Sequence, residues 1–412
     1  MSNTDLYPRY IKPLLLEALK DSPVVLIHGP RQCGKTTLAR TVGTPKKYEY
    51  ISFDDDVMTK AAKEDPIGFV KGLSKRVILD EVQKVPHIFS TLKKEVDSNR
   101  VPGRFILTGS ANILRMPKLS DSLAGRMQIL RLHPLSQGEL EHHKSRFLDT
   151  LFKGAFKTKK MELSLNKLIN RIVTGGYPEV FKRPSERRRI NWYQNYVKTL
   201  IQRDILDISK IRSVDILPRL LALSATQTSQ LVNFANLASA FQVSRPTVFD
   251  YIALFEQMFF LEKLPPWYSS RFRRLIKTPK LHLCDTGLTC ALLGVNAASL
   301  KKNRPLLGQL LETFVFQELR RQASYHKQNH AFFHYRNKKG TEVDIVIERG
   351  HLVAGVEVKS SATVNLADFK GLRMLKQAVG KHFACGVILY NGETSVGFGN
   401  GFFAVPLNVL WI

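Results

Sequence analysis

The stretch HGPRQCGKTT, residues 28 to 37, contains the spacing G-x-x-x-x-G-K-T. Glycines at these positions let a loop curl so that successive backbone N–H groups point toward phosphate oxygens. Lys35 would then reach the β- and γ-phosphates of a nucleotide, and the Thr36 hydroxyl would coordinate Mg²⁺. The chemistry predicted for this segment is the binding of ATP together with Mg²⁺.

Carboxylates with a matching role follow at the end of an apolar run, RVILDE, residues 76 to 81. Asp80 is suited to contact Mg²⁺, and Glu81 to polarise the water that attacks the γ-phosphate. A later run, FILTGSAN, ends in small polar residues, of which Ser110 and Asn112 could sense the γ-phosphate by hydrogen bonding. An ordinary turn would have much the same composition.

These groups need a strand, a loop and a helix to position them. VVLI, residues 24 to 27, predicts a buried strand before the loop, and TTLARTV predicts a helix after it, so that the helix N-terminus adds its dipole to the phosphate site. The residues expected to line the nucleotide site are Gly29, Pro30, Arg31, Gln32, Cys33, Gly34, Lys35, Thr36, Thr37 and Ser110.

Five segments in sequence order, GPRQCGKTT, ILDEVQKVP, FILTGSAN, SLAGR and PLSQGE, resemble a large prokaryotic family of AAA-type ATPases that carry a C-terminal domain of unknown function, DUF4143. The resemblance covers nearly the whole chain. It implies that Arg126 of SLAGR stands where an arginine finger would stabilise transition-state charge. A surface arginine in a basic protein is the alternative.

Near the C-terminus, two segments alternate as strands do. In EVDIVI the apolar residues 343, 345 and 347 are expected on one face and Asp344 on the other. In AGVEVK, residues 354, 356 and 358 share a face, which leaves Glu357 and Lys359 on the opposite one. A hairpin that turns at Gly350 and His351 would place Asp344 directly opposite Glu357, with Cβ atoms roughly 5 Å apart.

Two carboxylates this close repel each other, and hydrated Mg²⁺ is the usual solution. We therefore expect Asp344 and Glu357 to bind a metal that polarises a scissile phosphate, with Lys359 stabilising the attacking species. The D…E-x-K pattern with an upstream helical Glu312 resembles the restriction-endonuclease-like fold, which implies that these four residues form its active site. The alternatives are ordinary salt bridges, or a fold retained as a nucleic-acid grip without cleavage.

Between these regions, residues 231 to 264 have the pattern of a helix-turn-helix, and Ser244 can cap the second helix. Arg245, Thr247 and Asp250 would face a DNA groove. MFFLEKL and LIKTPKLHLCD would form the hairpin wing, whose phosphate-attracting residues are Arg271, Arg273, Arg274 and Lys277. Winged helices also bind proteins. The charge run KRPSERRR, residues 182 to 189, is expected to be a solvated face, with a phosphate-contacting strip as the alternative.

Composition agrees with a polyanionic partner. The 412-residue chain has 62 Lys and Arg against 35 Asp and Glu, a formal net charge of +27, which favours nucleic acid over an anionic membrane surface, although a generally basic proteome would give the same surplus. The start of the chain has no apolar signal segment, and no run reaches the ~18 apolar residues of a membrane helix. The four cysteines show no C-x-x-C pairing, so a cytoplasmic location is expected.

The predicted fold is α/β in four parts. They are a P-loop AAA-type ATPase domain (1–145), a helical lid or linker (146–228), a winged-helix domain (229–295) and a restriction-endonuclease-like α/β domain (300–412). The predicted function is Mg²⁺-dependent ATP hydrolysis coupled to binding of nucleic acid, with DNA favoured, and to metal-dependent phosphodiester cleavage. The alternatives are a nucleotide switch with an inactive nuclease-like domain, and a scaffolding ATPase without a nucleic acid partner. Because an arginine finger acts on a neighbour, a nucleotide-dependent homo-oligomer is expected.

Overall fold

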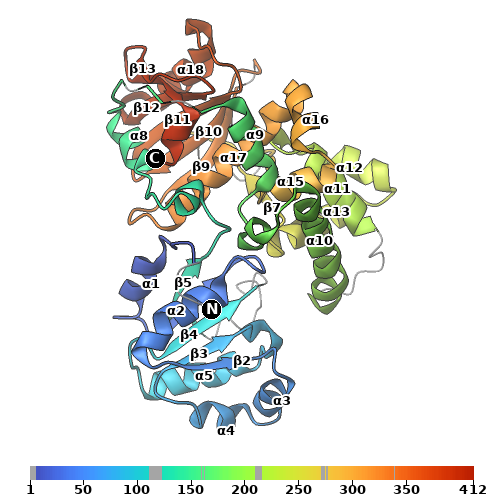
Figure 1. Ribbon diagram of the computed structural model, residues 1–412. Helices are drawn as coiled ribbons and strands as arrows, with labels where there is room; N and C mark the ends of the chain where they lie inside the picture. The colour runs from blue at the N-terminus through green and yellow to red at the C-terminus, as the bar shows by residue number, and fades with distance from the viewer. Residues whose placement is uncertain are drawn as a thin grey trace. The chain divides into compact units, whose positions relative to one another are not determined.

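The computed structural model describes residues 6–110, 123–158, 160–161, 163–208, 216–270, 274, 277–337 and 339–412. Two compact units make up the chain (Figure 1). The first extends to residue 135 and also includes residues 257–259, and the second contains residues 136–256 and 260–412. No described helix is both long enough and apolar enough to cross a membrane.

The first unit is built on a parallel sheet of five strands in the order β2-β3-β4-β1-β5 (Figure 1). The strands are β1 (Val24–His28), β2 (Glu49–Ser52), β3 (Val77–Asp80), β4 (Phe105–Gly109) and β5 (Met127–Arg131). The apolar runs of β1, β3 and β4 are buried along their whole length, as expected for central strands of a parallel sheet that is covered on both faces. The carboxyl ends of these strands therefore meet at one edge.

Helix α1 (Lys12–Ala18) precedes the first strand of this sheet. Between the strands lie the helices α2 (Lys35–Gly43), α3 (Asp56–Glu64), α4 (Pro66–Lys71) and α5 (Ile88–Ser98). The apolar stripe of α5, which includes Phe89 and Leu92, packs in one cluster with Leu26, Leu79 and Leu107 of the central strands. Burial of these side chains fixes the strands that present the polar loops.

The second unit contains a mixed sheet in the order β13-β14-β12-β11-β10-β9. Its strands are β9 (Ala331–Arg336), β10 (Glu342–Arg349), β11 (Leu352–Lys359), β12 (Phe383–Tyr390), β13 (Val396–Gly397) and β14 (Phe402–Pro406). The neighbours of β10 are antiparallel to it, whereas β11, β12 and β14 run parallel. One face packs against α8 (Phe147–Lys153) and the long α17 (Arg304–Ser324), and the other against α18 (Lys370–Val379).

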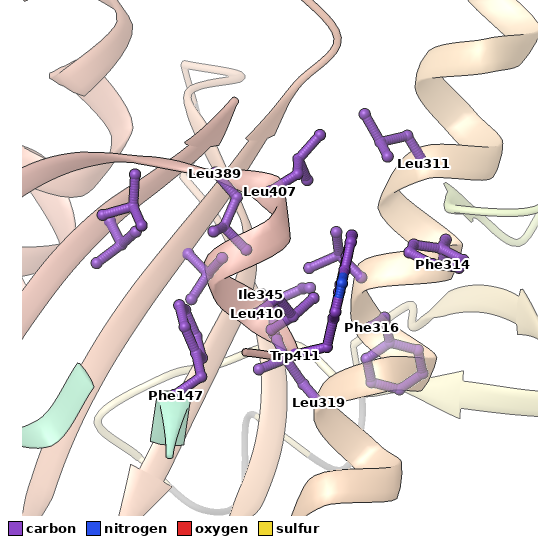
Figure 2. Packing of buried hydrophobic residues seen from close by; sticks show 14 of the residues in the cluster. Phe147, Leu311, Phe314, Phe316, Leu319, Ile345, Leu389, Leu407, Leu410 and Trp411 are labelled. Carbon is purple, nitrogen blue, oxygen red and sulfur yellow. The ribbon is translucent and has the colours of Figure 1, made fainter. Parts of the chain in front are cut away.

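Figure 2 shows the larger of these two cores, where side chains of α17 meet the sheet. Leu311, Phe314 and Leu319 of α17 face Ile345 of β10, and Trp411 from the end of the chain lies among them. Trp411 is 1% exposed and packs edge-on against Phe314, with ring centroids 6.1 Å apart. This core holds α17, and with it Glu312, against the strands that carry Asp344 and Glu357.

Further helices and a small sheet lie in the same unit. The helices are α7 (Gln137–Leu140), α9 (Leu165–Thr174), α10 (Glu186–Ile208), α11 (Ile216–Thr226), α12 (Phe234–Phe241), α13 (Arg245–Gln257), α15 (Thr286–Leu293) and α16 (Ala297–Lys302). The small sheet has the order β6-β8-β7, with β6 (Gln230–Leu231), β7 (Leu261–Leu264) and β8 (Lys280–Leu283). As the sequence predicts, β7 and β8 pair antiparallel after the α12–α13 helix pair.

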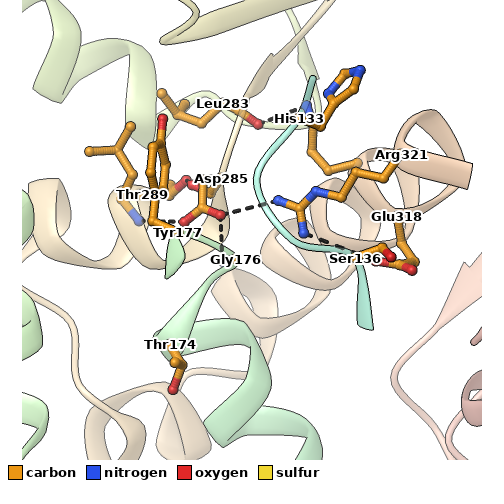
Figure 3. A network of polar contacts seen from close by, with 12 residues as sticks. His133, Ser136, Thr174, Gly176, Tyr177, Leu283, Asp285, Thr289, Glu318 and Arg321 are labelled. Atoms are coloured by element: carbon orange, nitrogen blue, oxygen red, sulfur yellow. Dashed lines mark hydrogen bonds and ion pairs between the residues drawn. The ribbon is translucent and has the colours of Figure 1, made fainter. Parts of the chain in front are cut away.

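A buried carboxylate, Asp285, ties these helices together (Figure 3). It is fully buried, caps α15, and accepts hydrogen bonds from the Gly176 N–H (2.7 Å) and the Tyr193 hydroxyl (2.9 Å). Arg321 of α17 completes the set with an ion pair at 3.1 Å. The carboxylate is therefore fully paired, as burial of a charge requires. Gly176 belongs to the segment GGYPEV, residues 175–180, which lies between α9 and α10 and donates its N–H to Asp285.

Candidate nucleotide site and C-terminal carboxylate cluster

The loop after β1 has the backbone that its glycines permit. Gly34 has φ 98° and Gln32 has φ 59°, both in the left-handed region, and α2 begins directly after them at Lys35. A Cβ at Gly29 would lie 2.1 Å from the carbonyl oxygen of Leu132, so no larger residue fits there. The predicted order of strand, loop and helix is confirmed.

Lys35 is only 4% exposed, and its Nζ donates to the carbonyl oxygen of Pro30 at 2.8 Å. The ammonium group therefore lies inside the curl of the loop. Arg9, from the segment before α1, donates to the carbonyl oxygens of Cys33 and His133, both at 2.6 Å. It ties the loop after β1 to the loop after β5. Sequence reasoning missed this residue, which belongs to no motif.

Asp80, at the end of β3, is a buried carboxylate that accepts hydrogen bonds from three hydroxyl groups. Thr36 Oγ1 lies 3.0 Å from both Asp80 oxygens, the Tyr50 hydroxyl lies 2.8 Å from Oδ2, and Thr108 donates to Oδ1. Burial and the hydrogen bond to Asp80 raise the pKa of Tyr50 to about 12. All three donors are neutral, so the negative charge of Asp80 is not cancelled by a cationic side chain among them.

These residues fit a Mg²⁺ ion of the kind that P-loop proteins use. The hydroxyl of Thr36 and the carboxylate of Asp80 are already in contact, and both are oxygen ligands of the type that Mg²⁺ prefers. When bound, the ion would neutralise charge that develops on the β- and γ-phosphates. Thr36 and Asp80 would hold it, while the loop amides and Lys35 bind the phosphates.

Glu81 follows Asp80 in the left-handed region, with φ 56°, which turns its side chain away from the direction of the strand. Its Oε2 accepts a hydrogen bond from Ser110 Oγ at 2.9 Å and another from Gln83 Nε2. Gln83 also donates to Ser110 Oγ at 2.9 Å. Ser110 thus contacts Glu81, an arrangement that the sequence did not reveal. Asn112, predicted beside it, lies outside the described residues.

Positive charge gathers where β1 and β5 end. The register pairs His28 with Arg131, so Arg131 lies at the same sheet edge as the loop that carries Lys35. Burial, with Arg131 and Lys35 nearby, lowers the pKa of His28 to about 3, so its ring stays neutral. Sequence reasoning did not single out Arg131, although its place at the carboxyl end of a strand was a usable signal.

Arg126 lies at the opposite edge of this sheet. It precedes Met127, which pairs with Val24 at the start of β1, so the length of β5, roughly 16 Å, separates it from the end that faces the loop. Its guanidinium makes a two-pronged contact with Asp97 of α5, with NH2 3.0 Å from Oδ2, and donates to the Ala124 carbonyl at 3.0 Å. Arg126 is therefore far from Lys35 in the same chain, and its role as an arginine finger stays a prediction.

In the second unit, the β10–β11 hairpin has the predicted register. Ile345 pairs with Val356 and Arg349 with Leu352, so the turn falls at residues 350 and 351 and Asp344 comes opposite Glu357. The prediction that residues 343, 345 and 347 share one face is wrong. Val343 packs with the α18 core, whereas Ile345 and Ile347 pack with the α17 core, because the β9–β10 register shifts between Val343 and Val346.

Both carboxylates are present in one cluster, each 8% exposed. Asp344 Oδ2 accepts a hydrogen bond from the Val358 N–H at 2.9 Å. A residue from outside the predicted set completes the cluster: Lys280, the first residue of β8, is 3% exposed. Its Nζ lies 2.8 Å from Glu312 Oε1 and 3.5 Å from Asp344 Oδ1.

Burial and the charge of Asp344 raise the pKa of Glu312 to about 8, against the opposing effect of Lys280. Burial, Asp344 and a hydrogen bond to it also raise the pKa of Glu357 well above its ordinary value. Burial acts to lower the pKa of Lys280, but Glu312 and Asp344 raise it above its ordinary value, so this amine stays protonated. The cluster combines one buried cation with more carboxyl groups than that cation can balance.

Lys359 lies at the end of β11, where its Nζ is 3.6 Å from Asp368 Oδ1 and the side chain is 39% exposed. Within the described residues, no group of three or more His, Cys, Asp or Glu side chains is arranged to hold a metal ion. The Lys280 ammonium stands where a cation would neutralise Glu312 and Asp344. Metal binding by Asp344 and Glu357 stays a prediction.

The α12–α13 pair begins and caps as predicted. Ser244 Oγ accepts a hydrogen bond from the Thr247 N–H at 3.2 Å, and Arg245 and Asp250 are exposed on α13. Phe249, also exposed, stacks on Phe234 with centroids 4.0 Å apart. The exposed side of α13 therefore carries the polar residues Arg245 and Asp250 together with Phe249, which stacks on Phe234 of α12.

The expected basic wing differs in one residue. Arg274 is not directed at solvent, because NH1 and NH2 each lie 2.8 Å from an oxygen of Glu348 in β10 and the guanidinium stacks over Trp267 and Phe333. Lys277 is exposed, and Arg271 and Arg273 lie outside the described residues. The segment after β7 also pairs with β9 through the His334 N–H and the Pro265 carbonyl at 2.9 Å. It is docked on the mixed sheet.

Three family models match the chain. An AAA domain matches residues 21–141, a domain of unknown function (DUF8612) matches residues 165–299, and a domain of unknown function (DUF4143) matches residues 307–410. The first contains the loop that carries Lys35 together with Asp80 and Glu81. The third contains Glu312 and the β10–β11 hairpin, whereas Lys280 comes from the second.

An uncharacterized protein of Mycobacterium tuberculosis is 29% identical over 95% of this chain and 82% of its own length. An uncharacterized protein of Methanocaldococcus jannaschii is 26% identical over 79% of this chain and 72% of its own. Among solved structures, the Walker-type ATPase PABY2304 of Pyrococcus abyssi has a TM-score of 0.45 and 15% identity, covering 70% of this chain and 97% of that one.

The Holliday junction branch migration motor RuvB of Thermotoga maritima has a TM-score of 0.30 and 18% identity, covering 62% of this chain and 89% of that one. With the strand order of the first unit and the geometry around Lys35 and Asp80, the matched models confirm the two domains that the resemblance predicts. The chain contains an AAA-type P-loop domain at residues 21–141 and a C-terminal DUF4143 domain at residues 307–410.

Proposed function

We propose that this protein hydrolyses ATP with Mg²⁺ and uses the nucleotide cycle to control how its second unit binds nucleic acid, with DNA as the favoured form. The observation that supports it most is the contact between Thr36 and both oxygens of Asp80, beside a loop that buries Lys35. In this reaction Glu81, held by Ser110 and Gln83, orients and polarises the attacking water.

Nucleic acid binding is supported by charge and by exposed groups. The net charge of +27 attracts a polyanion, and the second unit exposes Arg187 and Arg188 on α10 and Arg245 on α13. Lys182 and Arg183 of the same basic run are instead paired with Glu179. The exposed arginines therefore remain the candidates for phosphate contacts.

ATP hydrolysis is tested by phosphate release from wild type and Lys35→Ala, with and without Mg²⁺. Nucleic acid binding is tested by fluorescence anisotropy with single-stranded DNA, duplex DNA and RNA, in the presence and absence of a non-hydrolysable ATP analogue. Arg245→Ala should weaken binding, whereas Arg183→Ala, already paired with Glu179, is the matched control. Binding that disappears at moderate salt and does not respond to nucleotide would contradict the coupling.

Cleavage of phosphodiester bonds by the DUF4143 domain is a second candidate. One observation favours it, the register that brings Asp344 opposite Glu357 near the end of the hairpin. Mg²⁺-dependent nicking of DNA that is lost in Glu357→Ala and retained in Lys35→Ala would support it. The contacts of Lys280 with Glu312 and Asp344 favour the alternative, a nuclease-like domain that binds nucleic acid without cleaving it.

A further inference from the structure

A lysine that belongs to no predicted motif reaches the carboxylates of the DUF4143 domain. Lys280 starts β8 in the small sheet, whereas Glu312 and Asp344 come from α17 and β10. The side chain is 3% exposed, so the contact is not a surface ion pair. A protein rarely buries an ammonium group unless carboxylates surround it, and here two of them do.

We propose that Lys280 is a built-in cation that occupies the metal position of the carboxylate cluster, so that the cluster excludes divalent ions while β8 keeps its place. A divalent ion between Asp344 and Glu357 would lie within a few ångströms of the ammonium group. Like charges at that distance in a buried site repel strongly, so the ion and the amine exclude each other. The proposal goes beyond the proposed function, since it concerns the ion that the cluster accepts.

Other contacts hold Lys280 in place. Its strand pairs with β7 from Leu261↔Leu283 to Leu264↔Lys280, and the backbone that follows β7 is fastened to β9 by the Pro265–His334 hydrogen bond. Trp267 adds a hydrogen bond from its indole nitrogen to Glu348 at 2.7 Å. Pro265 and Trp267, which follow β7, are therefore anchored on the same sheet as Asp344.

Lys359 does not replace Lys280 beside Glu312 and Asp344. Lys359, the lysine of the E-x-K pattern, is 3.6 Å from Asp368 and partly exposed, so it does not take the position that Lys280 occupies. Gly371 of α18 leaves little free space beside Glu357, because a Cβ there would lie 2.8 Å from Glu357 Oε1. The cation beside Glu312 and Asp344 is therefore the Lys280 ammonium group.

The experiment counts Mn²⁺ ions bound per chain by electron paramagnetic resonance, in the full-length protein without nucleotide. Wild type and Asp344→Asn should bind the same number, because the cluster holds no divalent ion in either. Lys280→Met should gain about one further ion per chain, and Lys280→Met combined with Asp344→Asn should lose it again. Lys263→Met is the control. It removes a lysine of the neighbouring strand β7 that is paired with Glu256 at 2.9 Å, and it should gain no Mn²⁺ ion.

Two results would overturn the proposal. One is a lower Mn²⁺ count in Asp344→Asn than in wild type, which would show that metal binds with Lys280 in place. The other is a folded Lys280→Met protein that gains no ion. Should Lys280→Met not fold, Lys280→Gln replaces it, and the comparison of wild type with Asp344→Asn decides the matter without either. Any metal bound near Asp80 is common to all these variants and cancels in the differences.

Discussion

Two buried aspartates of this protein, Asp80 at the end of β3 and Asp344 near the start of β10, have opposite surroundings. Asp80 accepts hydrogen bonds from Thr36, Thr108 and Tyr50, which are neutral. Asp344 lies beside the Lys280 ammonium group and a second carboxyl group. Hydroxyl donors orient a carboxylate and leave its charge available to a metal, whereas an ammonium group cancels that charge. We therefore expect the type of donor to distinguish a site that binds Mg²⁺ from one that does not.

The largest expected effect comes from neutralising each aspartate in turn. Asp80→Asn keeps the size of the side chain but removes the charge that attracts Mg²⁺, so kcat for ATP should fall by about 100-fold or more, which corresponds to ~2.7 kcal/mol of lost transition-state stabilisation. Asp344→Asn should leave kcat within about twofold of wild type. Steady-state phosphate release at saturating ATP measures both. Equal losses in the two variants would refute the distinction.

A somewhat smaller effect is expected for Glu81→Gln. The amide can still contact Ser110 and Gln83, but it cannot accept a proton from water, so kcat should fall by about 100-fold at most while ATP still binds. Binding of a fluorescent ATP analogue, measured beside turnover, separates the two steps. Loss of nucleotide binding in this variant would instead indicate a structural role.

The pH dependence of stability tests the cluster itself. Because the pKa of Glu312 is about 8 in the folded protein against an ordinary 4.5, the folded state holds a proton that the unfolded chain releases. Stability should therefore fall as pH rises from about 4.5 to about 8. Glu312→Gln should make this fall shallower in thermal melts between pH 5 and pH 8.

Two controls accompany that measurement. Glu393→Gln, which alters a surface residue paired with Lys160, should keep the wild-type slope. Part of the slope should also persist in Glu312→Gln, because burial raises the pKa of Glu318 to about 7. A wild-type slope in Glu312→Gln would show that Glu312 ionises normally in the folded protein.

The smallest effect on an isolated chain is expected for Arg126→Ala. Its side chain contacts Asp97 at the sheet edge far from Lys35, so a monomer should hydrolyse ATP at the wild-type rate. A loss of activity should emerge only at concentrations where sedimentation shows self-association with bound nucleotide. A slower rate in a demonstrated monomer would contradict action on a neighbour.

The sequence predicted the first unit well because its signals are local. The loop around Lys35 and the strand before Asp80 are contiguous stretches whose chemistry depends on neighbours along the chain. The β10–β11 register was also predictable, since alternation and a short turn fix it together. The face of the sheet on which Val343 lies was not predictable, because it depends on a register shift in the pairing of β10 with β9.

Residues missed by sequence reasoning act at long range. Lys280 is one lysine among many in a basic chain, and only the packing of β8 against α17 and β10 shows that it is buried with carboxylates. Tyr50 reaches Asp80 from the neighbouring parallel strand β2. Gln83 follows β3 and donates a hydrogen bond to Ser110, which follows the adjacent strand β4. Such contacts depend on the order of the strands in the sheet, and a short sequence motif does not indicate that order.

The guanidinium of Arg9 has a practical consequence. The matched AAA domain begins at residue 21, so a shortened chain that starts there would keep every recognisable motif and still lack the side chain that fastens two loops beside Lys35. We expect the shortened chain to bind nucleotide with lower affinity than the intact chain. The boundary of the sequence match therefore leaves out a residue that contacts the loop carrying Lys35.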